Sequence, residues 1–152
     1  MKYLRFVIIG LVLTLPIVTI YLSGSKYFSC QVFYRPDVTI QTPVRPITAE
    51  AARSPAEHEK GLSGRECIGR NKAMLFFHQE PGQFAYWMKD MKFSIDILWI
   101  GADKKVVKLK THVSPDTFPN KFTNDEPAMY VLELGAGEAA RLGLTKGTQI
   151  NF

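Results

Sequence analysis

Short apolar and alternating runs recur along the chain from residue 38 onward, and they predict strands. The runs are of strand length, and glycine, proline or small polar residues typical of turns separate them. The predicted strands cover residues 38–41, 46–52, 73–77, 84–88, 94–100, 105–110, 130–134 and 148–152. Sheet structure therefore dominates the predicted fold.

Two short helices are predicted among these strands. Ser54 suits an N-cap, Pro55 the first helical position and Glu57 the reciprocal partner in a capping box, and Gly61 ends the helix soon afterwards. Residues 137–142 form the second helix. The whole pattern predicts an α+β, mainly β fold: a small, partly closed β-barrel-like domain with two short helices at its ends.

Three segments lack either pattern. Residues 61–71 are charged and glycine-punctuated, residues 79–83 have the composition of a turn, and residues 111–127 are polar and contain three prolines. The last segment is long for a loop within a small domain. We therefore expect it to cross the surface as a functional flap.

The N-terminus differs from the rest of the chain. Residues 6–25 are uncharged, match the length of a membrane-spanning helix, and follow the cationic Lys2 and Arg5. We predict a signal anchor over residues 1–25, with a cleaved signal peptide as the alternative because residues 23–25 are small. The N-terminal cations place the following residues outside the cytoplasm, as a tether (26–44) and an exported β-rich domain (45–152).

Charge and composition exclude several classes of function. The formal net charge is +5, of which Lys2 and Arg5 supply two units, so the exported part is only mildly basic and nucleic acid is not an expected partner. The lysines at 104, 105, 108 and 110 fit a solvated strand edge. The three histidines show no metal-ligand spacing, so neither a metal nor a cofactor is expected. Cys30 and Cys67 lack a CxxC motif and are either one disulfide or two free thiols.

The stretch from Phe84 to Ile100 is the strongest candidate for a binding surface. It places the charged residues Lys89 and Asp90 beside the large side chains of Tyr86, Trp87 and Met88. An exposed Trp87 would suit stacking on a carbohydrate or peptide, although tryptophan is more often buried, and burial is the favoured prediction.

Two carboxylates occupy unusual positions in apolar strands. Asp96 points with Leu98 and Ile100, and Glu133 lies among leucines and a valine. A structural interpretation makes Asp96 a buried anchor that accepts backbone N–H groups from a loop such as 89–93. The catalytic alternative brings Asp96 and Glu133 together with Lys89 as a hydrolase site.

Several ordered motifs resemble the exported domain-of-unknown-function family 192 over residues 48–152. They are Glu57, Gly61-Leu62 and Arg65, then MLFF from Met74, YWMKDMKFSIDI from Tyr86, PAMYVLELGAG from Pro127 and LGLTKG from Leu142. The resemblance implies a compact β-rich domain behind a signal or membrane anchor. It implies no activity, because the family has no agreed one.

The favoured functional hypothesis is a membrane-anchored binding or accessory module of the cell envelope, whose partner is a glycan or peptide. Its surface would combine residues 87–96 with the flap at 111–127. An envelope hydrolase and a structural assembly partner are the alternatives, and the sequence leaves the oligomeric state open.

Overall fold

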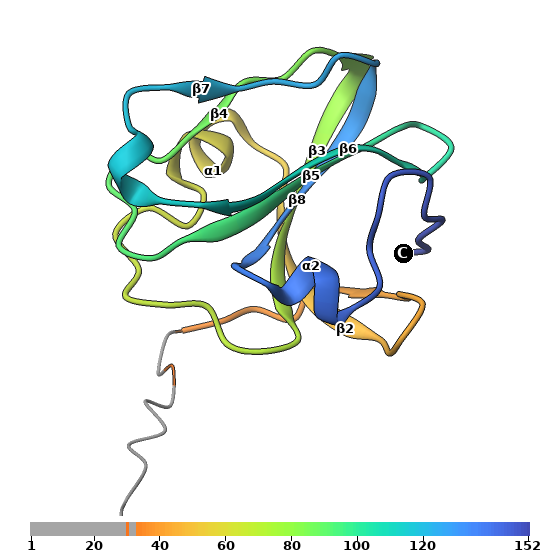
Figure 1. The fold of residues 1–152 in the computed structure, drawn as a ribbon, viewed down its shortest axis with the longest axis horizontal. Coiled ribbons are helices and arrows are strands. Elements are labelled where there is room, and N and C mark those ends of the chain that lie inside the picture. Colours follow the sequence, from red (N-terminus) through yellow and green to blue (C-terminus); the bar gives the residue numbers. More distant parts are fainter. Residues whose placement is uncertain (1–29, 31–32) are drawn as a thin grey trace, which may run out of the picture.

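A six-stranded sheet forms the centre of the structure, a computed structural model that describes Cys30 and residues 33–152 (Figure 1). The strand order is β1-β2-β3-β8-β5-β6, in which β2 and β3 are parallel and the other neighbours antiparallel. The strands are β1 (Val38–Ile40), β2 (Ile47–Ala52), β3 (Lys72–Gly82), β5 (Ile95–Ile100), β6 (Val106–Val113) and β8 (Ala128–Gly135). A mainly β fold is confirmed.

The remaining elements are short. A two-stranded ribbon pairs β4 (Tyr86–Trp87) with β7 (Lys121–Phe122). The helices are α1 (Pro55–Lys60), α2 (Glu138–Arg141) and the 3-10 helix η1 (Pro115–Thr117). The predicted capping box of α1 is present, since the Ser54 hydroxyl accepts from the Glu57 backbone while the Glu57 carboxylate accepts from the Ser54 backbone.

Apolar side chains cover both faces of the sheet. Every residue of β5 is buried, with Leu98 and Ile100 in one core and Ile97 and Trp99 in the other. In Figure 1, α2 and the C-terminal segment lie on one side of the sheet, and α1, β4 and β7 lie on the other. The fold is thus three layers thick at its centre.

The sheet is open, which corrects the predicted partly closed barrel. The edge strands β1 and β6 do not pair with each other. The predicted last strand, 148–152, instead forms isolated bridges to both edges, Gln41 to Asn151 and Lys105 to Gln149. A segment that divides its hydrogen bonds between two edges cannot extend a ladder along either one.

Two predicted segment boundaries also differ from the structure. β3 continues through the predicted turn at 79–83, with irregular pairing between Phe77 and Gly82. The predicted loop at 111–127 contains the end of β6, η1 and β7. No helix among the described residues is long and apolar enough to cross a membrane, and the predicted anchor at 6–25 lies outside them.

Asp96 ties three elements together inside the domain. The residue is fully buried, and its Oδ1 accepts the His112 backbone N–H at 2.9 Å while Oδ2 accepts that of Ala139 at 3.0 Å. It therefore fixes β5 against the irregular end of β6 and the start of α2. The anchor interpretation is confirmed, but the donors come from these elements and not from residues 89–93.

Replacing Asp96 with alanine should strip both backbone donors of their buried acceptor. We expect Asp96→Ala to lower the free energy of unfolding by about 2–4 kcal/mol, measured by urea denaturation. Asp90→Asn, at an exposed aspartate, is the control and should change it by less than about 0.5 kcal/mol. Equal effects of the two variants would contradict the anchor role.

Candidate functional site

A row of side chains containing two glutamates runs across one face of the sheet. Glu50 in β2 is the register partner of Met74 in β3, which pairs with Glu133 in β8, which pairs with Ile97 in β5. Register partners point to the same face, and strands lie about 4.8 Å apart, so the backbones of Glu50 and Glu133 are roughly 10 Å apart. Both glutamates are buried, at 3% and 5% exposed.

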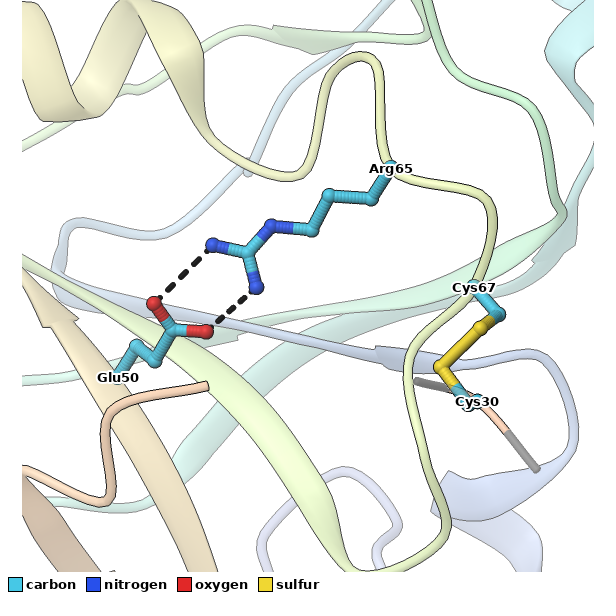
Figure 2. The surroundings of a disulfide bond; sticks show 4 residues. All are labelled: Cys30, Glu50, Arg65 and Cys67. Atoms are coloured by element: carbon cyan, nitrogen blue, oxygen red, sulfur yellow. Dashed lines mark hydrogen bonds and ion pairs between the residues drawn. A yellow bond between two sulfur atoms is a disulfide. The ribbon is translucent and has the colours of Figure 1, made fainter. Parts of the chain in front are cut away.

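Arg65 neutralises the first of these glutamates. Its two terminal nitrogens bind the two Glu50 oxygens at 2.5 and 3.0 Å (Figure 2), and Arg35 Nε lies 3.8 Å from Oε2. A fork of this kind gives a buried carboxylate both charge compensation and hydrogen bonds. Glu50 is therefore a fixed wall of the site.

A disulfide holds the loop that carries Arg65. Cys67 lies two residues further along this loop and is bonded to Cys30, as Figure 2 shows. Of the two alternatives that the sequence left open, the disulfide is the one present. The bond ties the segment before β1 to the α1–β3 loop and so restrains the position of Arg65.

Glu133 has no such partner. Among the described residues, its carboxyl makes no hydrogen bond, although the residue is only 5% exposed. Gly61, which has no side chain, lies next to this carboxyl: a Cβ atom at Gly61 would be 3.8 Å from Glu133 Oε2. Burial raises the pKa of Glu133 to about 8, against the opposing charge of Arg65. Glu133 is thus mainly a neutral acid, able to donate a hydrogen bond at pH 7.

A pocket of about 420 Å³ opens beside this row, between α1, β2 and β3. Ala51, Ala56 and Met74 supply apolar walls, while Arg35 and Lys60 bring positive charge. Its size falls in the range of small-molecule sites, which combine apolar walls with a few fixed polar groups. Glu50, Arg65 and Gly61 line this concavity, whereas Glu133 is not a lining residue and lies next to Gly61. We call the concavity, together with the adjacent Glu133, the Glu133 pocket.

Glu57 also lines the pocket but is committed to the helix. Its carboxylate accepts the backbone N–H groups of Arg53 and Ser54, which lower its pKa to about 2. It remains ionised in any physiological condition, so its role in the pocket is structural.

Aromatic and imidazole rings lie behind Glu133. The Tyr86 hydroxyl is 3.2 Å from His78 Nε2, and the His78 ring is 4.9 Å from that of His58. Burial lowers the pKa of His78 to about 4, with a smaller contribution from His58, and burial with the nearby Glu133 raises the pKa of Tyr86. His78 and Tyr86 are therefore neutral at pH 7. Within the described part of the chain, no cluster of ligand-type side chains could hold a metal.

The structure separates the predicted catalytic pair. Asp96 is the register partner of Leu134, and Glu133 that of Ile97, so the two carboxylates point to opposite faces of the sheet. Asp96 is also saturated by backbone donors. The hydrolase arrangement of Asp96, Glu133 and Lys89 is therefore not formed.

The predicted binding residues divide by exposure. Tyr86, Met88 and Asp96 are buried, whereas Trp87, Lys89 and Asp90 are exposed. The favoured burial of Trp87 is wrong, since 39% of this residue is exposed. β4 places Tyr86 inward, and the alternation of strand side chains then turns Trp87 outward.

Sequence reasoning missed Glu50 and the pairing role of Arg65. Glu50 lies in an alanine-rich strand, where an isolated acidic residue between buried neighbours signals a charge that needs a partner. Arg65 was noted only as part of a motif. No sequence signal connects the two, because the β2–β3 pairing and the disulfide bring them together.

The raised pKa of Glu133 predicts a pH-dependent stability. Between the ordinary glutamate pKa and about 8, the folded chain holds a proton that the unfolded chain has released, so this contribution to stability is full at low pH and lost as the pH rises to about 8. From pH 5 to pH 8, the wild type should lose about 2–4 kcal/mol of unfolding free energy relative to Glu133→Gln.

Urea denaturation at several pH values measures this difference. His78 titrates in both proteins and cancels. Glu80→Gln, at an exposed glutamate, is the control and should follow the wild type. A difference between the wild type and Glu133→Gln that does not change with pH would show that Glu133 titrates normally.

The comparisons with known proteins agree with this fold. A Novosphingobium aromaticivorans protein of unknown function is 28% identical, with a TM-score of 0.69 over 75% of this chain and 82% of its own. A Sinorhizobium meliloti protein, provisionally described as a transcription regulator, is 29% identical, with a TM-score of 0.68 over 74% of this chain and 89% of its own. No curated protein matches the chain. The model of DUF192, described as an uncharacterized ACR, matches residues 37–152, and the chain belongs to this family of domains of unknown function.

Proposed function

We propose that this chain is a binding module of the cell envelope that takes a small polar ligand, a saccharide unit or a short peptide, in the Glu133 pocket. The observation that carries the proposal is the buried, neutral acid of Glu133, which makes no hydrogen bond among the described residues and lies on the same sheet face as a fixed Glu50–Arg65 pair. Gly61 lines the pocket and has no side chain to cover Glu133, so a ligand that enters beside Gly61 can accept a hydrogen bond from the acid.

The chemistry of the pocket favours recognition over turnover. Both oxygens of Glu50 accept hydrogen bonds from Arg65, and the Glu57 carboxylate accepts backbone donors. No second carboxylate is therefore free to act with Glu133. The apolar walls of Ala51, Ala56 and Met74 suit the nonpolar face of a sugar ring or a small side chain.

Two features support a location outside the cytoplasm. The uncharged stretch 6–25 follows a cationic N-terminus, as in a signal anchor. Disulfides such as Cys30–Cys67 persist in oxidising compartments and are rare in the cytosol. In this proposal residues 6–25 hold the domain at the cytoplasmic membrane, and cleavage after residue 25 would release the same domain.

The methyl resonances of the pocket walls can be used to test this proposal. The full-length chain in detergent, with ¹³C-labelled alanine and methionine methyl groups, is titrated with fragments of envelope glycans and with short peptides. We expect at least one fragment to shift the Ala51, Ala56 and Met74 resonances. Shifts confined to other methyl groups, or no shift with any fragment, would contradict a ligand site here.

Variants of Glu133 identify the donor. Glu133→Met removes the hydrogen bond to the ligand and should weaken binding about tenfold, whereas Glu133→Gln keeps a donor and should retain most of the affinity. Asp125→Asn, at an exposed residue on the loop before β8, is the matched control. Equal binding by the methionine and glutamine variants would remove Glu133 from the recognition of the ligand.

A further inference from the structure

A second surface carries an exposed aromatic pair flanked by lysines. Trp87 and Phe118 are 39% and 46% exposed, and their ring centroids lie 5.8 Å apart. The Nζ atoms of Lys121 and Lys89 lie 5.2 and 5.8 Å from the centroid of the Trp87 ring. We call these four residues the aromatic surface.

The aromatic surface is assembled from two distant segments. β4 pairs with β7 so that Trp87 stands opposite Lys121, and η1 leads into Phe118. Next to the Tyr86–Phe122 end of this ribbon, the buried Asn124 side chain accepts from the Phe84 backbone and donates to the carbonyls of Gly82 and Glu126. These bonds join the segments that enter β4 and leave β7. The ribbon that carries Trp87 and Lys121 is thus held in place, and two large exposed rings on it indicate a partner.

Charge indicates which partner fits. Among the described residues, neither Lys89 nor Lys121 forms a salt bridge, whereas lysines such as Lys92 and Lys108 are paired with carboxylates. Two uncompensated cations beside two rings in edge-to-face contact are complementary to a chain that alternates flat apolar faces with negative charges. Sugar rings that carry carboxylates have both properties.

The position of the aromatic surface argues against the chain's own membrane as its binding partner. In Figure 1, β4 and β7 lie at the top of the view, while the first described segment, coloured orange, enters the domain at the bottom. A chain tethered through its N-terminal segment would turn this surface away from its own membrane.

We propose that the aromatic surface binds an anionic polysaccharide, with sugar rings stacked on Trp87 and Phe118 and acidic groups paired with Lys89 and Lys121. This inference rests on the proposed location outside the cytoplasm and not on the ligand of the Glu133 pocket.

Tryptophan fluorescence offers a direct readout. Trp99 is fully buried and donates to the Phe84 carbonyl, so a ligand at the aromatic surface contacts Trp87 alone of these two. Titration of the full-length chain in detergent with polygalacturonate oligomers should change the fluorescence saturably, and about 0.5 M salt should weaken the binding. Neutral dextran should bind at least about tenfold more weakly. No binding of polygalacturonate, or equal binding of dextran, would overturn the proposal.

Calorimetry on variants separates stacking from charge. Phe118→Ala should weaken polygalacturonate binding about fivefold, and the double variant Lys89→Gln/Lys121→Gln about tenfold. Arg45→Gln/Lys105→Gln, which removes the same charge at exposed sites on other turns, should retain the wild-type affinity. Equal losses in the two double variants would mean that only net charge matters and would overturn the site.

Two further probes test the class of partner. Poly-glutamate carries the charge without sugar rings, and vesicles containing anionic phospholipid present a membrane surface. Both should bind more weakly than polygalacturonate, and tighter binding of either would overturn the proposal in favour of an acidic peptide or a lipid surface. The pocket methyl resonances provide a separate readout, so failure here is distinguishable from failure of the proposed pocket ligand.

Discussion

The ion pair between Glu50 and Arg65 is the interaction on which the Glu133 pocket depends. It compensates a carboxylate that the sheet holds among apolar side chains, and it does so with an arginine from a loop that a disulfide restrains. Removing one partner of such a buried pair leaves the other charge unpaired at a cost of about 3–5 kcal/mol. The pair thus fixes both the wall of the pocket and the α1–β3 loop above it.

Glu133 is the second glutamate of this row and, unlike Glu50, is not paired with an arginine among the described residues. It lies two strands from Glu50, close enough for Arg65 to oppose the rise in its pKa but without a hydrogen bond from it. Burial therefore dominates, and the acid keeps its proton at neutral pH. One face of the sheet carries a glutamate that is paired with arginine and a neutral one that makes no hydrogen bond among the described residues, a combination that provides fixed polar recognition beside apolar walls. Asp96, on the other face, only supports the fold.

Much of the fold could be predicted from local patterns, because strand alternation and helix capping act within a few residues. The face of Asp96, the capping box of α1 and most strand positions followed in this way. Closure of the sheet could not, because it depends on where the C-terminal segment divides its hydrogen bonds. The candidate site was equally non-local, because strand pairing brings Glu50 and Glu133 onto one face and the disulfide-restrained loop brings Arg65 to Glu50. The alternation that correctly grouped Asp96 with Leu98 and Ile100 gave no register for β8. The exposure of Trp87 could not be predicted from the average burial of tryptophan, because β4 is a ribbon strand with one exposed face.

The pKa of Glu133 is the measurement that tests this account most directly. A ¹³C-detected titration of the full-length chain, labelled at the glutamate side-chain carboxyl and assigned with Glu133→Gln, follows the group itself. We predict a midpoint of about 8, and a still higher midpoint in Arg65→Met, where the opposing charge is absent. A midpoint near the ordinary glutamate value would mean that Glu133 is ionised at neutral pH, and it would contradict a neutral acid poised for a ligand.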